Sequence, residues 1–198
     1  MDKPRTREER SGTTIRHVLE VAEKHFAEAG YEATSTEALV REAGLTRGAL
    51  YHHFGSKEGL FEAVVRSVQG RLAQAVAAST ADQDLWAAFV AGCHAWLGAA
   101  THPAVRQILL LDAPAVLGWE RWLALDAEGG GRLLREGVAE LVAEGTLEGV
   151  QPEALTQLLN GAMNQAALWV AHAPDRGAAL EDAERTLERL LEGLKKAR

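Results

Sequence analysis

Apolar residues recur every three or four positions along most of this sequence, which is the spacing of one face of an α-helix. The first such stretch runs from Ser11 to about Ala29, and Gly30 follows as its expected end. Its apolar positions are Ile15, Val18, Leu19, Ala22 and Phe26. No segment shows the strict alternation that a half-buried strand needs. The pattern therefore predicts an all-α protein of about nine or ten helices.

Residues 34–60 predict two short helices joined by a tight turn. Either Thr34 or Ser35 supplies the side-chain oxygen that caps the first of them. Its apolar side is formed by Leu39, Val40 and Ala43. Gly44 then ends the helix, because glycine adopts the left-handed conformation without a steric penalty.

The second short helix is expected from Arg47 to about His53, directly after Thr46 as its cap. Gly55 ends it, and a third helix follows. A helix of this size fits the major groove of DNA, where its N-terminal residues reach base edges. The residues expected on its outward face are Arg47, Gly48, Tyr51 and His52.

A long helix from Lys57 to about Ala78 is expected to connect this region to a second module that begins near Asp82. Asp112–Pro114 is expected to break the helical pattern, and Gly129–Gly131 to form a hinge or turn. No Gly-Lys-Ser/Thr follows these glycines, so they do not form a phosphate loop. Further helices are predicted over residues 85–97, 104–111, 115–125, 132–144, 152–171 and 180–194.

Hydrophobic residues make up 47% of the 198 residues, which is enough for a real core. Cys93 is the single cysteine, so no disulfide can form within the chain. The charged N-terminus lacks the apolar segment of a signal peptide. The longest apolar stretch, residues 87–100, is too short and too mixed to span a bilayer. These features predict a cytoplasmic protein.

The formal net charge of −7 disfavours a DNA partner at first sight. Residues 1–60, however, carry nine basic and ten acidic side chains, so most of the excess lies in residues 61–198. Residues 1–10 are interpreted as a basic mobile arm, with an ordinary solvated tail as the alternative. The charge predicts weak non-specific binding that salt reverses, and it favours a symmetric dimer that reads two half-sites.

The outward face of the helix at residues 47–53 combines groups that suit a polyanion. Its hydroxyl and imidazole groups donate hydrogen bonds without bringing a fixed negative charge. Gly48 fits an exposed position that a phosphate or base approaches closely, since glycine costs about 1 kcal/mol in a helix interior. Lys57 adds an ammonium group near a helix N-terminus, where a phosphate is already favoured.

The run LTRGALYHHFGSKEGLFEAV, with AEAGYEATSTEALVREAG before it, resembles the helix-turn-helix of the TetR/AcrR transcriptional regulators. The resemblance covers roughly residues 11–65 and is specific. It implies a DNA-binding domain over residues 11–60 and a helical ligand-binding and dimerisation domain over residues 61–198. Contacts to DNA are expected from Thr36, Thr46, Arg47, Gly48, Tyr51, His52, His53 and Lys57.

The resemblance implies a regulator, most often a repressor, that a small-molecule effector releases from a palindromic operator. It also implies a homodimer in which the last two helices of each protomer pack as a four-helix bundle. The alternative is that these helices only cover the core of their own protomer. No cofactor is expected.

Four of the five tryptophans lie between residues 86 and 122, and flat aromatic walls with a few polar groups suit a small-molecule pocket. The alternative is that these tryptophans belong to the core. His94 is a further polar candidate. The candidate ligand-binding residues are Trp86, Phe89, Cys93, Trp96, Arg106, Trp119, Trp122, Asn160, Met163 and Asn164.

Cys93 has no neighbouring Lys or Arg to lower its pKa, which favours a buried inert thiol over a redox sensor. Cys93, His94 and His102 do not have the spacing of a structural zinc site, and no metal is expected. The rival functions are a helical enzyme or a protein-binding adaptor with a helix-turn-helix-like module. The sequence contains no G-x-S-x-G, H-E-x-x-H or phosphate-loop motif, so no enzyme is predicted.

Overall fold

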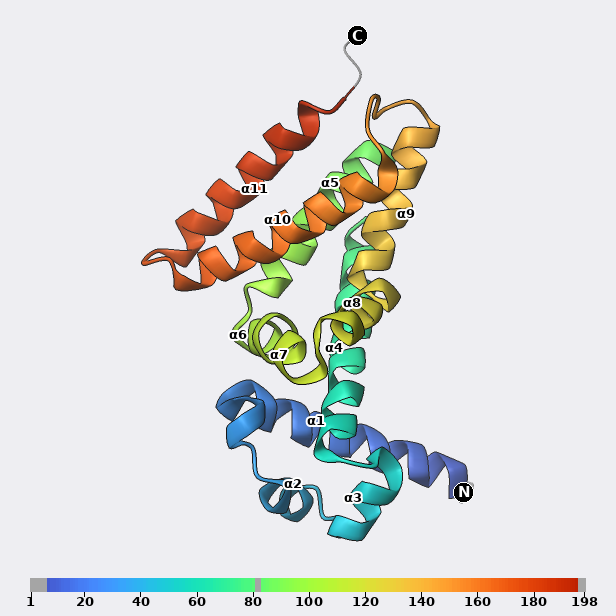
Figure 1. Ribbon diagram of the computed structural model, residues 1–198, viewed down its shortest axis with the longest axis vertical. Coiled ribbons are helices and arrows are strands. Elements are labelled where there is room, and N and C mark those ends of the chain that lie inside the picture. Colours follow the sequence, from blue (N-terminus) through green and yellow to red (C-terminus); the bar gives the residue numbers. More distant parts are fainter. Residues whose placement is uncertain (1–6, 81–82, 196–198) are drawn as a thin grey trace, which may run out of the picture.

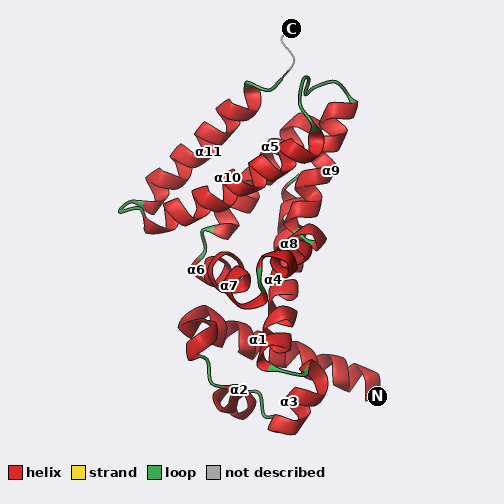
Figure 2. Ribbon diagram, in the orientation of Figure 1, coloured by secondary structure: helices red, strands yellow, loops and turns green. Residues whose placement is uncertain are grey.

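The computed structural model describes residues 7–80 and 83–195. In these ranges the chain consists of helices joined by turns and loops (Figure 2). The exception is one isolated antiparallel bridge between Leu147 and Lys195. The all-α prediction is confirmed. The described part of the chain forms eleven α-helices and one π-helical segment, slightly more than expected. No helix within it has the length and apolar character to cross a membrane.

The first three helices form a small lobe at one end of the molecule (Figure 1). They are α1 (Arg7–Ala33), α2 (Thr36–Glu42) and α3 (Arg47–Phe54). Helix α1 begins before the expected Ser11, so residues 7–10 of the predicted arm are helical, and residues 1–6 lie outside the described residues. Gly30 interrupts α1 with a φ of 77°, where the sequence predicted its end.

Side-chain caps fix where the two short helices begin. Ser35 caps α2, because its side-chain oxygen accepts a hydrogen bond from the backbone N–H of Ala38. Of the two predicted caps, Ser35 is therefore the correct one. Thr34 is buried instead and donates its hydroxyl to the Gly30 carbonyl oxygen at 2.7 Å. Thr46 caps α3 in the same way as Ser35 caps α2. Gly44, between the two helices, has a φ of 65°, as the turn requires.

Helix α4 (Lys57–Ser79) runs from the small lobe into the rest of the molecule. Its first half packs against α1 and α3, and its further contacts include α5, α8 and α9. Phe61 near its start is fully buried and packs edge-to-face on Phe26 of α1, with ring centroids 4.9 Å apart. One helix therefore contributes side chains to the cores of both lobes.

The larger lobe is built from the remaining helices, of which α10 and α11 lie side by side at the end remote from α3 (Figure 1). Their bounds are α5 Leu85–Ala100, α6 Pro103–Val105, the π-helix η1 Arg106–Asp112, α7 Ala113–Leu117, α8 Trp119–Glu128, α9 Gly130–Ala143, α10 Pro152–His172 and α11 Arg176–Glu192.

The predicted break at Asp112–Pro114 is wrong. The chain passes directly from η1 into α7, and Pro114 stands in the first turn of α7 without ending the helix. The break comes at Gly118, with φ 78° and ψ 160°. This backbone conformation is essentially restricted to glycine.

A carboxylate of the large lobe is hydrogen-bonded to the small lobe. Asp112, the last residue of η1, accepts the backbone N–H of Tyr31 at 2.8 Å. The Gln107 side chain donates to the other oxygen of Asp112 at 3.0 Å. A Cβ atom on Gly30 would lie 3.4 Å from the Gln107 amide nitrogen, so the kinked end of α1 fits closely against η1.

Four polar side chains inside the large lobe form a hydrogen-bonded chain. Asp126 of α8 is 6% exposed and accepts hydrogen bonds from Gln69 of α4 at 3.2 Å and from Asn160 of α10 at 2.8 Å. Asn164 donates in turn to Asn160 at 3.1 Å. Burial raises the pKa of Asp126, and the two amide donors and Arg135 oppose that rise.

The glycines at 129–131 form a turn only in part. Gly129 makes the turn, whereas Gly130 and Gly131 are buried in the first turn of α9. A Cβ atom on Gly131 would overlap the Asp126 carboxyl group, and one on Gly130 would lie 2.9 Å from the Trp96 indole nitrogen. Close packing therefore requires these glycines, and the hinge prediction accounts for Gly129 alone.

Replacing Gly118 by alanine is expected to lower the free energy of unfolding by about 1–3 kcal/mol, because the side chain forces a backbone conformation that only glycine adopts easily. No atom lies within 4 Å of the added Cβ, so the loss is conformational. The matched control is Gly70→Ala, at an exposed helical position, which should raise stability by about 0.5–1 kcal/mol. Urea unfolding of both variants checks this; equal effects would contradict it.

The raised pKa of Asp126 makes the free energy of unfolding depend on pH. The folded protein holds this proton more tightly than the unfolded chain, so stability falls as pH rises above the ordinary Asp pKa and through the raised folded pKa. Asp126→Asn cannot titrate. The stability of the wild-type protein relative to this variant should therefore decline as pH rises above about 4, the ordinary Asp pKa. Urea unfolding at a series of pH values from about 4 upward measures it, and parallel curves would rule it out.

Candidate DNA-binding surface and ligand cavity

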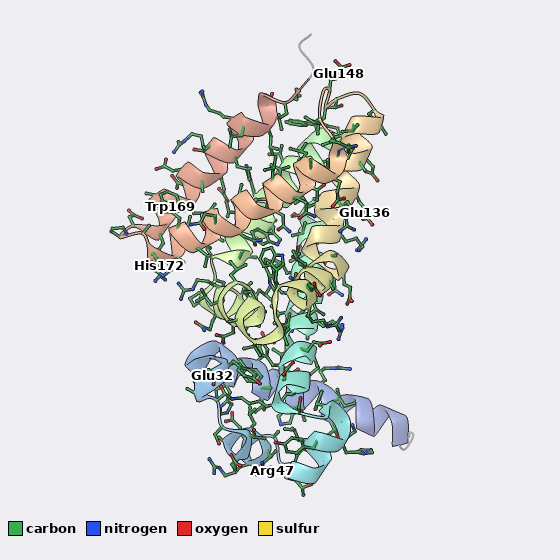
Figure 3. The ribbon with its side chains drawn as sticks, in the orientation of Figure 1. Glu32, Arg47, Glu136, Glu148, Trp169 and His172 are labelled. Atoms are coloured by element: carbon green, nitrogen blue, oxygen red, sulfur yellow. The ribbon has the colours of Figure 1, made fainter. Side chains whose placement is uncertain are left out.

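Helix α3 is held to the small lobe by one side and leaves its other residues exposed. Leu50 is fully buried, whereas Arg47, Gly48, His52 and His53 are exposed. Arg47 lies at the extreme end of the molecule, remote from α10 and α11 (Figure 3). The helix therefore presents its N-terminal residues outward, as groove binding requires.

Arg47 is positioned by two neighbours. Its guanidinium group lies 3.2 Å from a carboxylate oxygen of Glu37 on α2 and 5.5 Å from the centre of the Tyr51 ring. Tyr51 is half-buried. Hydrogen bonds from the backbone amide of Glu37 and from Ser35 keep the Glu37 pKa below its usual value, so Glu37 is ionised at neutral pH.

Lys57 lies at the start of α4 and is directed by the end of α1. Its ammonium nitrogen lies 4.3 Å from the centre of the Tyr31 ring and donates to the Glu32 carbonyl oxygen at 3.4 Å. These contacts place a positive charge beside the capped N-terminus of α4. A phosphate is favoured at such a position.

The other predicted DNA contacts occupy the same three elements. Thr36 is the half-buried first residue of α2, and Thr46 is the exposed cap of α3. The rings of His52 and His53 lie 5.5 Å apart at the C-terminal end of α3. All eight residues proposed from sequence thus lie on α2, on α3 with its cap, or at the start of α4.

Sequence reasoning missed Glu37 as a member of this surface. The contact between Glu37 and Arg47 crosses the turn between two helices. The two residues are ten positions apart, and no repeating pattern in the sequence marks a contact at that distance. The only hint was that both residues occur in the first turns of neighbouring short helices.

A cavity of about 220 Å³ lies in the large lobe between α4, α5, α9 and α10. Five of the predicted ligand-binding residues line it, namely Phe89, Cys93, Trp96, Asn160 and Met163. Burial raises the pKa of the Cys93 thiol to about 12, which supports the interpretation of an inert thiol. The described residues include no group of three His, Cys, Asp or Glu side chains placed to hold a metal ion.

The other five predicted ligand-binding residues do not line this cavity: Trp86, Arg106, Trp119, Trp122 and Asn164. Trp86 donates its indole N–H to Glu192 of α11 at 3.1 Å. Trp122 is a core residue that donates to the Leu109 carbonyl oxygen at 2.8 Å. Trp119 is 63% exposed. The alternative that some tryptophans belong to the core is therefore correct for Trp122.

One complete wall of the cavity was missed from sequence. It comes from α9, which was read as an ordinary amphipathic helix. The α9 lining residues are Gly130, Gly131, Leu133, Leu134, Glu136, Gly137 and Glu140. Gly137, in the middle of that helix, was the available signal, because glycine inside a helix usually has a packing reason.

Helices α10 and α11 expose large apolar side chains on the outside of the protein. Leu158 is 71%, Trp169 is 51% and Leu190 is 61% exposed. A groove between the two helices adds further apolar residues, including Leu187 and Ala166. Trp169 lies at the outer end of α10 (Figure 3). Exposed apolar surface of this kind marks an interaction site.

Comparison with protein-family models gives two matches. A model described as "Bacterial regulatory proteins, tetR family" matches residues 18–64. A second, described as "Tetracyclin repressor-like, C-terminal domain", matches residues 86–194, which is more than half of the chain. The first match covers α2 and α3, and the second covers most of the large lobe.

The chain is also similar to named relatives. It is 46% identical over 59 residues to the HTH-type transcriptional repressor AcnR of Corynebacterium glutamicum, a match that spans 30% of this chain and 31% of that repressor. It is 31% identical over 180 residues to the HTH-type transcriptional repressor Rv1474c of Mycobacterium tuberculosis, which covers 90% of this chain and 95% of the relative.

A solved structure extends the likeness to the whole fold. The crystal structure of a TetR-family transcriptional regulator from Pectobacterium atrosepticum is 37% identical to this chain and superimposes with a TM-score of 0.74. The match covers 98% of this chain and all of that structure. With both lobes matched and a relative aligned over nearly its whole length, this chain belongs to the TetR family of bacterial regulatory proteins.

Proposed function

We propose that this protein is a transcriptional repressor that binds operator DNA as a homodimer and leaves it when a small molecule occupies the cavity. The observation that carries the proposal is α3, which presents Arg47 and the two histidines outward at the tip of the molecule. The family membership and the repressor relatives support the same function.

In this proposal Arg47, Tyr51 and His52 contact base edges, and His53 and Lys57 contact phosphates. When the protein binds DNA, Arg47 leaves Glu37 and contacts a base instead. Its ion pair with Glu37 is exposed and screened by solvent, so it contributes little. A bidentate contact to guanine contributes about 1–3 kcal/mol of discrimination, so the base contact prevails. Thr36, Thr46 and Gly48 allow the backbone to approach the DNA.

The homodimer is proposed to form through α10 and α11. A two-fold axis beside these helices places the exposed Leu158, Trp169 and Leu190 against their counterparts in a four-helix bundle. The two α3 helices then face the same side of the dimer. The two α3 helices can contact the two half-sites of the operator when they lie about 34 Å apart, which is the length of one turn of DNA.

The effector is proposed to act through α4. Asn160 lines the cavity and also donates to Asp126, which in turn accepts from Gln69 of α4. A molecule that competes for Asn160 changes the hydrogen-bond partners of Asp126. It thereby changes the position of α4 relative to the helices packed against it. Because α4 begins beside α3, a tilt changes the separation of the two recognition helices and shifts the population away from DNA binding.

Two substitutions separate the groove contact from the phosphate contact. Arg47→Ala should weaken operator binding by about 1–3 kcal/mol for each half-site and relax the preference for operator over random DNA. Lys57→Ala removes two phosphate contacts from the dimer, so it should weaken binding to both DNAs alike and reduce the magnitude of the salt slope of log K by about 1.8. Fluorescence anisotropy with DNA from upstream of the protein's own gene provides the measurement.

The control for these variants is Arg176→Ala, which removes an exposed arginine at the start of α11, remote from α3. Circular dichroism verifies that each variant is folded. Wild-type affinity and salt slope in both Arg47→Ala and Lys57→Ala would refute the assignment of this surface.

The dimer is tested by Leu190→Glu. Each buried leucine contributes about 1.5 kcal/mol or more, and two-fold symmetry places the substitution twice in the interface. We therefore expect dimer association to weaken by about 3 kcal/mol, or roughly 100-fold, with parallel loss of operator affinity. Leu111→Glu, at another exposed leucine in η1, is the control. Sedimentation equilibrium measures both, and an unchanged dimer in Leu190→Glu would exclude this interface.

A further inference from the structure

The cavity has an aromatic wall that α9 is shaped to accommodate. A Cβ atom on Gly137 would lie 2.7 Å from the Phe89 ring, and one on Gly130 would lie 2.9 Å from the Trp96 indole nitrogen. Both glycines stand in α9. The two aromatic side chains therefore lie directly against the α9 backbone, and both line the cavity.

The ionisable side chains of the lining are acidic. They are Glu136 and Glu140, together with Cys93, whose raised pKa keeps it neutral. The lining contains no Lys, Arg or His. Arg132 donates to both carboxylate oxygens of Glu136 at 2.9 Å and neutralises it. Glu140 is exposed and has no ion-pair partner among the described residues, so it places a solvated negative charge at the rim of the cavity.

The other polar groups of the cavity supply no positive charge that would attract an anion. Asn160 donates one N–H to Asp126 and its carbonyl oxygen accepts a hydrogen bond from Asn164, so its side chain is already held by two partners. The N-terminus of α9 would attract an anion, but the Asp126 carboxyl group already lies against Gly131 there. A carboxylate or phosphate ligand would find no cation and would be repelled by Glu140.

We propose that the effector of this cavity is a compact, mainly apolar molecule with one positive charge, such as an aryl- or alkylammonium ion. This inference rests on the proposed function, because it takes the cavity as the effector site. The apolar part lies between Phe89 and Met163, and the ammonium group lies near Trp96 or Phe89 and Glu140. A cation over an aromatic face is attracted by the electrons of the ring, which an uncharged molecule of the same shape is not.

The test uses the full-length protein and three probes with the same skeleton: phenylbutylamine, phenylbutanol and phenylbutanoate. Isothermal titration calorimetry should give the tightest binding for the amine, weaker binding for the alcohol and the weakest for the carboxylate. Glu140→Gln should reduce the preference for amine over alcohol by about five-fold, the effect of about 1 kcal/mol. Glu144→Gln, an exposed carboxylate on the next turn that does not line the cavity, should leave the preference unchanged.

A cavity-filling variant, Ala88→Phe, locates the binding site and should abolish binding of all three probes. If the carboxylate binds as tightly as the amine, or if Glu140→Gln leaves the preference unchanged, the inferred charge is wrong while the effector site stands. If Ala88→Phe leaves binding intact, or no probe binds to the wild-type protein, the cavity is not the site for such molecules and the inference is overturned. DNA binding, measured separately by anisotropy, tests the repressor function independently of these outcomes.

Discussion

The carboxyl group of Asp126 is buried between three helices, and an unpartnered carboxyl group in that place would be strongly destabilising. Gln69 reaches it from α4 and Asn160 from α10. The start of α9 must come close to the same group, and only glycine leaves the room for it. One polar residue thus fixes the relative positions of the helix that leads to α3, the helix proposed for the dimer and the helix that walls the cavity.

In the proposed mechanism, this arrangement joins the cavity to the proposed DNA-binding surface through α4. Helix α4 is packed against α1 and α3 at one end and against the cavity helices at the other. A rigid helix transmits a displacement only if both ends are fixed to something. The Asp126 group supplies one attachment, and the pair of Asp112 with the Tyr31 amide supplies a second contact between the lobes.

Local features were predictable from sequence, and the interactions that join distant segments were not. Ser35, Thr46 and Gly44 define the small helices through contacts within a few residues, and a sequence pattern records such contacts directly. Asp126 gives no such signal, because its partners lie 57 and 34 residues away. Three of the residues proposed for ligand binding, all on the apolar helix α5, line the cavity. Trp119 and Trp122 do not line it, since an aromatic residue type does not specify whether it points to a cavity, the core or solvent.

The bond between Asp112 and Tyr31 has an asymmetry with a practical meaning. The acceptor is a side chain of the large lobe, but the donor is the main chain of the small lobe, which every residue except proline supplies. The hydrogen bond therefore requires a carboxylate in the large lobe, whereas in the small lobe it requires only the glycine that turns the end of α1. Hybrid regulators that combine the small lobe of one relative with the large lobe of another can keep this hydrogen bond. The large lobe must carry the carboxylate, and the small lobe must carry the glycine.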